Sequence, residues 1–209
     1  ASCLVGSEMC IRDSPKVAFK ETIRKKSDVE YKYKKQSGGH GQYGHVKMTF
    51  EPSGDMDTPY VFEQTVVGGA VPKNFFPAVE KGIAESVKKG PLAAYPVTGI
   101  KAVLYDGSYH PVDSSEMAFK VATQQAFKKG IMEAKPVLLE PIATLKVVVP
   151  EGYTGDVMGE LNKRRARVMG MNPTDNGYQE IVADIPYLEL YGYNATLRSM
   201  TSGSGTFSY

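Results

Sequence analysis

The sequence predicts an α+β chain built from two domains. Segments that alternate apolar and polar residues, as strands do, are interleaved with segments whose apolar residues recur every three or four positions, as in helices. From residue 136 onward the segments follow the order βαββαβ, which is typical of a ferredoxin-like split βαβ domain. Residues 15–131 hold more strands than helices and predict a β-rich domain of βαβ type. A length of 209 residues accommodates two such domains.

The first domain opens with strand-like segments at residues 17–23, 30–35, 45–50 and 60–67. Gly68 and Gly69 then interrupt the chain. Pro72 suits the first turn of a helix. Spacings of three and four predict the buried face of that helix, which consists of Phe76, Val79, Ile83 and Val87. Gly90 and Pro91 end the helix.

A further strand, loop and helix complete this domain. Residues 97–105 predict the strand, which leads into a polar loop. Asp113 suits the N-cap of the helix, and Glu116 stands three residues further on, as in a capping box. The helix ends near Gly130, and its inner face carries Ala118, Val121, Ala122 and Ala126.

The second domain is expected over residues 136–209. Residues 133–141 contain two prolines and predict a connection into it. Its strands are expected at 142–149, 166–171 and 178–184, with helices at 154–164 and from Pro186 onward. The cluster of turn residues at 172–177 separates two of the strands. Residues 206–209 predict the start of a last strand, so we expect this domain to be cut short.

Residues 1–14 differ in character from the rest of the chain. They show no periodicity and no basic segment before a long apolar one, so they do not resemble a signal peptide. We interpret them as a leader or a foreign segment. The only cysteines, Cys3 and Cys10, lie there and form no disulfide framework. This predicts that the protein is located in the reducing cytoplasm. No run approaches the roughly 18 apolar residues of a membrane span, so we expect no membrane contact. We also expect a monomer.

Two polar loops are the strongest functional signal. Residues 36–45 place four glycines and two histidines between two strands, and residues 105–116 carry a third histidine at a turn. Glycine loses more conformational entropy on ordering than other residues do, so four in one loop favour a partner that orders them. Neither loop has the apolar residues of a core. The two loops predict a projecting tip that contacts nucleic acid.

Two kinds of chemistry are alternatives to nucleic-acid contact. His40, His45 and His110 suggest zinc, but no His-Glu-x-x-His motif is present, so we expect no metal. A hydrolase could use His110 as a general base oriented by Asp106 or Asp113. No nucleophile elbow accompanies them, and the phosphate-binding motif of nucleotide hydrolases is absent. We therefore expect no catalytic residues in this chain.

A cluster of cations spans the end of the helix at 154–164 and the next strand: Lys163, Arg164, Arg165 and Arg167. One or two of them complement the helix dipole, and four exceed that need. Contact with phosphates and a solvated face remain equally open interpretations. The same holds for the lysine-rich residues 20–35. The net charge of +2 does not decide between them.

Several motifs in one order resemble elongation factor G, a family of bacterial translational GTPases. Residues 15–23, 38–44, 68–72 and 109–116 resemble its domain IV, and residues 159–165 and 197–205 resemble its domain V. The resemblance implies a carboxy-terminal fragment without its own cofactor, since GTP and Mg²⁺ belong to an amino-terminal domain of the parent. His40 and Lys163 resemble a paralogous branch. The parent is therefore the main translocase, a second elongation factor G or a ribosomal-protection relative.

The resemblance also implies partners and contact residues. Domain IV of the family enters the decoding centre of the small ribosomal subunit, and domain V faces the factor-binding region of the large subunit. Contacts with tRNA and mRNA then fall on Ser37, Gly38, Gly39, His40, Gly41, Gln42, Tyr43 and Gly44, and on Tyr109, His110, Pro111 and Val112. Contacts with ribosomal RNA fall on Lys163, Arg164, Arg165 and Arg167.

Overall fold

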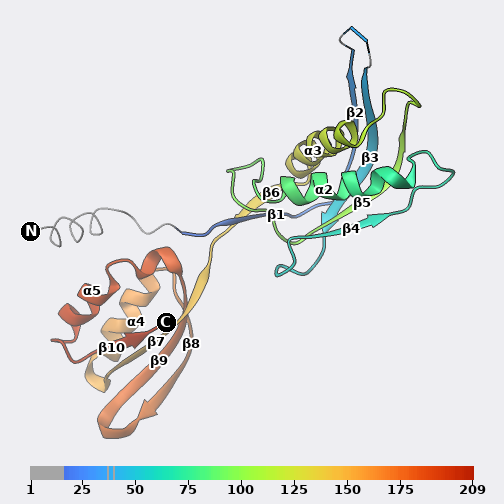
Figure 1. Cartoon of the computed structure of the whole chain (residues 1–209). Helices are drawn as coiled ribbons and strands as arrows, with labels where there is room; N and C mark the ends of the chain where they lie inside the picture. Colours follow the sequence, from blue (N-terminus) through green and yellow to red (C-terminus); the bar gives the residue numbers. More distant parts are fainter. Residues whose placement is uncertain (1–16, 37, 40) are drawn as a thin grey trace, which may run out of the picture. The chain divides into compact units, whose positions relative to one another are not determined.

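The computed structural model describes residues 17–36, 38, 39 and 41–209. They divide into two compact units, an amino-terminal unit of residues 19–139 and a carboxy-terminal unit that contains residues 140–209 (Figure 1). The leader predicted at residues 1–14 lies outside the described residues. None of the described helices is long and apolar enough to span a membrane.

The amino-terminal unit is built on a four-stranded sheet of order β2–β3–β5–β4. Its strands are β2 (Ser27–Lys35), β3 (Gln42–Pro52), β4 (Tyr60–Gln64) and β5 (Ile100–Ser108). Neighbouring strands are antiparallel except β4 and β5, which run parallel. Parallel neighbours need a crossover, and η1 (Lys73–Phe75) with α2 (Phe76–Ser86) supplies it. This is the βαβ element that the sequence predicts.

One face of this sheet is covered by helices. α3 (Glu116–Glu133) packs on β2 and β3, and α2 packs on α3 (Figure 1). Alternation along β3 and β5 sends the fully buried side chains to this face: Val46, Met48, Phe50, Ile100, Ala102 and Leu104. From α3, the ring of Phe127 meets that of Phe50 edge to face at 5.6 Å. The opposite face carries mostly polar side chains, with Val61 and Val103 among them.

A two-stranded ribbon joins the two ends of this unit. β1 (Lys20–Ile23) pairs antiparallel with β6 (Pro136–Leu139). The prediction of a plain connection at residues 133–141 is therefore wrong for β6, whose proline stands at the strand's first position, where it is tolerated. Glu21 of β1 is fully buried, and its carboxylate accepts hydrogen bonds of 2.8–3.1 Å from backbone N–H groups of residues 92, 93 and 95. These donors compensate for the lost hydration of the carboxylate.

The start of α3 differs from the prediction. Its N-cap is Ser115, whose side chain accepts a hydrogen bond from the backbone N–H of Ala118 at 3.2 Å. Glu116 is then the first helical residue, so the predicted capping box with Asp113 is wrong. The carboxylate of Asp113 accepts instead from the backbone N–H of Gly41 at 3.0 Å. That bond joins two loops, and local spacing does not reveal it.

The carboxy-terminal unit has a four-stranded sheet of order β10–β7–β9–β8 with antiparallel neighbours. Its elements are β7 (Ile142–Pro150), η2 (Glu151–Tyr153), α4 (Thr154–Lys163), β8 (Arg167–Thr174), η3 (Asp175–Gly177), β9 (Tyr178–Pro186), η4 (Tyr187–Leu190), α5 (Tyr193–Met200) and β10 (Thr206–Ser208). This order is that of a split βαβ domain. The predicted α+β class with two domains is confirmed.

Two boundaries in this unit differ from the prediction. The helix expected from Pro186 is in two parts, because the backbone between η4 and α5 is extended at Tyr191 and left-handed at Gly192, which has a φ of 73°. β8 continues to Thr174, so the turn expected at 172–177 is limited to η3. Beside this break, a side chain at the end of α4 binds the backbone carbonyls of Glu189, in η4, and of Tyr191, as described below.

Candidate functional site

The two loops singled out in the sequence lie together at one end of the amino-terminal unit. The hairpin of β2 and β3 extends beyond the helices (Figure 1). The backbone N–H of Tyr43 donates to the carbonyl of Asp113 at 2.8 Å, and Ser114 Oγ donates to the carbonyl of Tyr43 at 3.0 Å. The bond between Gly41 and Asp113 is a third link. We call residues 38, 39, 41–43 and 109–114 the tip.

Most predicted contact residues of the tip reach solvent. Gly38, Gly39, Gln42, Tyr109, His110, Pro111 and Val112 are exposed. Gly39 has a φ of 118°, which only glycine adopts readily. The exposed ring of Tyr109 offers a face on which a base can stack. Ser37 and His40, also predicted here, lie outside the described residues.

Gly44 has a packing role within the domain, and its contact with RNA stays a prediction. It is buried, and a Cβ atom there would lie 2.5 Å from the carbonyl oxygen of Ala118 in α3. The missing side chain lets β3 approach the first turn of that helix. Gly41 is half-buried, and a Cβ there would lie 3.1 Å from the carboxylate of Asp113. Both glycines therefore serve the contact between the hairpin and the second loop.

His110 bonds to its own loop through one ring nitrogen, Nδ1. Its Nδ1 accepts hydrogen bonds from the backbone N–H of Val112 at 3.3 Å and of Asp113 at 3.1 Å. Because a backbone N–H can only donate, Nδ1 is unprotonated and the ring proton lies on Nε2. The Asp113 carboxylate lies 3.5 Å from Nδ1, but this nitrogen has no proton to give it. The hydrolase alternative needs that hydrogen bond and is not supported.

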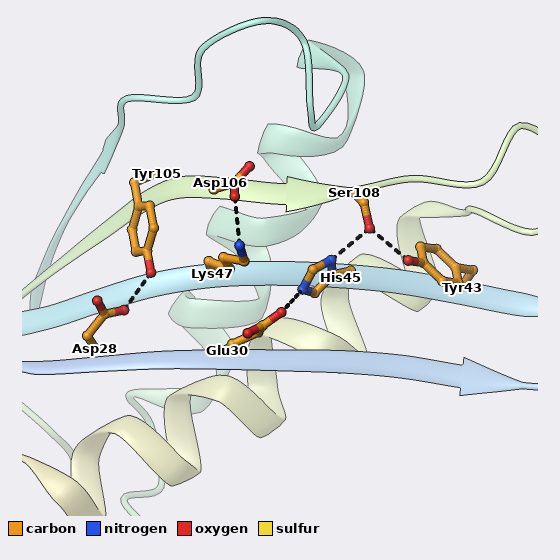
Figure 2. Close-up of polar contacts among 8 residues, drawn as sticks. All are labelled: Asp28, Glu30, Tyr43, His45, Lys47, Tyr105, Asp106 and Ser108. Atoms are coloured by element: carbon orange, nitrogen blue, oxygen red, sulfur yellow. Dashed lines mark hydrogen bonds and ion pairs between the residues drawn. The ribbon is translucent and has the colours of Figure 1, made fainter.

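A polar network covers the sheet face that the helices leave open (Figure 2). His45 is only 7% exposed, and its Nε2 lies 2.6 Å from Glu30 Oε1 while its Nδ1 lies 2.7 Å from Ser108 Oγ. Ser108 Oγ also lies 2.7 Å from the hydroxyl of Tyr43. His45 is thus a bonded residue of the sheet, and the described part of the chain holds no cluster of ligands for a metal ion. Alternation along β2 and β3, which sends Glu30 and His45 to one face, is the sequence signal for this network.

Two further pairs occupy the same face. Lys47 Nζ lies 2.9 Å from Asp106 Oδ2, and this hydrogen bond raises the pKa of the lysine and lowers the pKa of the aspartate. The hydroxyl of Tyr105 donates to Asp28 Oδ1 at 2.7 Å. That bond, together with desolvation and the negative charge of Asp28, raises the pKa of Tyr105 to about 12.

The shifted pKa of Tyr105 predicts a loss of stability at alkaline pH. An unfolded tyrosine ionises near pH 10, so the folded state holds its proton more tightly. The contribution of this group is complete below about pH 10 and is lost as the pH rises through about 12. We expect the unfolding free energy of wild type to fall more steeply over this range than that of Tyr105→Phe. Chemical unfolding at each pH measures the difference. An equal slope in both proteins would contradict it, and Tyr60→Phe on β4 is the control.

The basic cluster of the carboxy-terminal unit separates into paired and exposed members. Arg164 Nε lies 2.8 Å from Glu160 Oε1, and its Nη1 donates to the carbonyls of Glu189 and Tyr191 at 2.6 and 3.1 Å. Its Nη2 donates to Thr196 Oγ1 at 3.0 Å. Every nitrogen of the guanidinium is therefore engaged inside the unit, which gives Arg164 a structural role. Its contact with ribosomal RNA stays a prediction.

Arg165 shares a feature with each group, because its side chain is exposed and is also paired with carboxylates. Its Nη1 lies 2.8 Å from Glu140 Oε1, and its Nε lies 3.1 Å from Glu189 Oε1. Lys163 and Arg167 are exposed, and no carboxylate of the described residues lies within ion-pair distance of either. These two keep the charge that a phosphate contact requires.

Comparisons with known proteins agree with the two units. The family model "Elongation factor G, domain IV" matches residues 15–135, and the model "Elongation factor G C-terminus" matches residues 137–209. A curated Thermotoga maritima relative, an "Elongation factor G-like protein", is 51% identical over 194 residues, which are 93% of this chain and 28% of the relative. The crystal structure of a Thermus thermophilus protein matches with a TM-score of 0.80 and 45% identity, over 94% of this chain and 29% of that one. The chain thus spans less than a third of the length of these relatives.

Proposed function

This chain belongs to the elongation factor G family, as its domain IV followed by its carboxy-terminal domain, and from this premise we propose that it acts on the ribosome to promote the movement of tRNA and mRNA. The resemblance seen in the sequence is confirmed by both family matches. The matched carboxy-terminal domain corresponds to domain V of the resemblance. The Thermotoga maritima relative is an elongation factor G-like protein, so a paralogue of the main translocase remains the alternative parent.

The observation that carries the proposal is the tip. Two loops about seventy residues apart in sequence are joined by three hydrogen bonds, so they form one surface at the end of a sheet. The rest of the domain acts as a rigid lever, because β3, β5 and α3 share one tightly packed core. In our proposal the tip enters the decoding centre of the small subunit and blocks backward slippage of the tRNA.

The chemistry of the tip suits RNA. Gly38 and Gly39 have open space around them, so backbone can approach a nucleic acid closely. His110 offers the Nε2–H group as a donor to a phosphate, a ribose or a base edge, and Tyr109 offers a ring for stacking. Gln42 and Val112 extend the exposed surface beside them. Ser37 and His40 remain proposed contacts on the family resemblance alone.

The carboxy-terminal domain has a separate proposed role. We assign contact with ribosomal RNA of the large subunit to Lys163 and Arg167, with a weaker contribution from Arg165, whose charge is already paired. GTP and Mg²⁺ would be bound by another part of the parent protein, and this part acts as a monomer without a cofactor. The proposed site of action is the cytoplasm, where the ribosomes are.

Replacing His110 by Ala in the full-length parent is expected to slow single-turnover translocation about tenfold, which corresponds to roughly 1.4 kcal/mol of lost stabilisation. Ribosome binding, measured by co-sedimentation, should change less, because other domains contribute to it. His110→Gln keeps a side-chain donor and is the matched control, which should retain most of the rate. Unchanged translocation in His110→Ala would overturn the role of this residue.

A further inference from the structure

Three lysines at the tip end of β2 take no part in the network described above. Along β2 the even-numbered residues are exposed, so Asp28, Glu30, Lys32 and Lys34 follow one another on the open face of the sheet. Lys35, the last residue of the strand, is also exposed, although alternation places it on the other face. We call Lys32, Lys34 and Lys35 the lysine row. It lies in the lysine-rich segment of residues 20–35, for which the sequence alone does not decide between a solvated face and phosphate contact.

The carboxylates around this face are already bonded to other groups. Asp28 accepts from Tyr105, Glu30 from His45, and Asp106 from Lys47, at 2.6–2.9 Å (Figure 2). At the other end of the sheet, Glu51 and Glu63 pair with Lys26 and Lys101. Among the described residues, no carboxylate lies within ion-pair distance of the lysine row. The face is therefore divided into a part whose carboxylates are hydrogen-bonded within the sheet and a cationic part formed by Lys32 and Lys34, and the cationic part adjoins the tip.

The geometry of the row continues that of the tip. Lys32 Nζ lies 5.8 Å from the centre of the Tyr43 ring, close enough for a cation–π contact that holds the ammonium group beside the tip. Lys34 is the cross-strand partner of Tyr43, and Lys35 is that of Gln42. Alternate residues of a strand are about 7 Å apart, so Lys32 and Lys34 present two point charges from neighbouring positions on one face. Such a row binds a phosphate backbone by charge, independently of its sequence.

We propose that the lysine row binds the phosphate backbone of an RNA strand that reaches the tip. This inference rests on the proposed function, which it extends by naming a phosphate-binding surface outside the two loops. The phosphates would set the position of the strand, and the tip would contact its bases. RNA is favoured over an acidic protein because the side chains beside the row are polar, apart from the ring of Tyr43 that Lys32 covers.

Binding of this chain to a labelled single-stranded oligouridylate RNA, followed by fluorescence anisotropy across a salt series, tests the proposal. The triple variant Lys32→Gln, Lys34→Gln, Lys35→Gln should reduce the slope of log affinity against log salt by about 2, since each phosphate contact contributes about 0.7. At low salt its affinity should fall at least about tenfold. The control removes three exposed lysines elsewhere in the domain, Lys89, Lys128 and Lys129, and should change the slope by less than half as much.

Each outcome decides the question. An unchanged slope, an equal effect of the control, or no binding by the wild-type chain at the lowest salt would overturn the proposal. A labelled acidic polypeptide serves as a second probe. If this chain binds it, and polyglutamate displaces it while RNA does not, the proposal is also overturned. The single variants Lys32→Gln and Lys34→Gln, each expected to lower the slope by about 0.7, replace the triple variant if circular dichroism shows that it is unfolded. If His110→Ala leaves translocation unchanged while the salt slope still falls, the proposed role of His110 at the tip fails and this inference stands.

Discussion

Replacing Gly44 by Ala is expected to lower the unfolding free energy of domain IV by about 3 kcal/mol and to loosen the tip. The added methyl group would lie 2.5 Å from the carbonyl oxygen of Ala118, 2.7 Å from its carbonyl carbon and 2.9 Å from the backbone nitrogen of Phe119. All three are backbone atoms of the first turn of α3, so no side-chain rotation relieves the contact. β3 must move away from the helix.

The consequence for the tip follows from its hydrogen bonds. Tyr43, the neighbour of Gly44, donates to and accepts from the second loop, so a shift of β3 weakens those bonds. Denaturant unfolding measures the stability loss, and amide hydrogen exchange at Gly41 and Tyr43 measures the loosening. Gly170→Ala on β8 is the control, because its added Cβ has open space, and it should change stability by less than about 0.5 kcal/mol. Equal effects of the two substitutions would contradict the packing role of Gly44.

Replacing Arg164 by Ala is expected to destabilise the carboxy-terminal domain by about 3 kcal/mol, because it removes one partner of a half-buried ion pair. The Glu160 carboxylate and the carbonyls of Glu189 and Tyr191 lose their donor. The guanidinium also lies 5.4 Å from the centre of the buried Tyr193 ring, and that contact is lost as well. The junction between η4 and α5 should open.

Thermal and denaturant unfolding of this chain measure the effect. Lys163→Ala, one position earlier on the exposed end of α4, is the control. Its unfolding free energy should stay within about 0.5 kcal/mol of that of wild type. Arg164→Lys should recover little, since an ammonium group cannot reach the same acceptors as a planar guanidinium. A stable Arg164→Ala protein with a reduced salt dependence of ribosome binding would show that the arginine contacts RNA, as the family resemblance implies.

The class and order of the elements were predictable because they depend on local patterns. Alternation identified β3, and a stripe at helical spacing identified α2. The predictions of secondary structure were wrong where tertiary contacts determine the conformation of a segment. β6 was expected to be a connection because prolines mark loops, and only its pairing with β1, more than a hundred residues away, makes it a strand.

The candidate site shows the same division. The two loops could be selected from their glycine and histidine content, and exposure of residues 109–112 agrees with that selection. The separate roles of the residues within these loops could not be predicted from the sequence. Gly38 and Gly44 stand in the same sequence motif, yet one has open space around it and the other packs against α3. The four cations at residues 163–167 likewise look alike in sequence, whereas the structure pairs two of them with carboxylates and leaves two without an ion pair among the described residues.

By itself, the sequence determined that this is a two-domain α+β protein with a polar, glycine-rich hairpin and a histidine loop, because periodicity and backbone freedom are properties of neighbouring residues. Only the tertiary structure decided that Asp113 bonds Gly41 in place of capping α3, and that Arg164 binds the carbonyls before α5. A hydrogen-bond partner is chosen among all groups that the fold brings within about 3 Å, and most of those groups are distant in sequence.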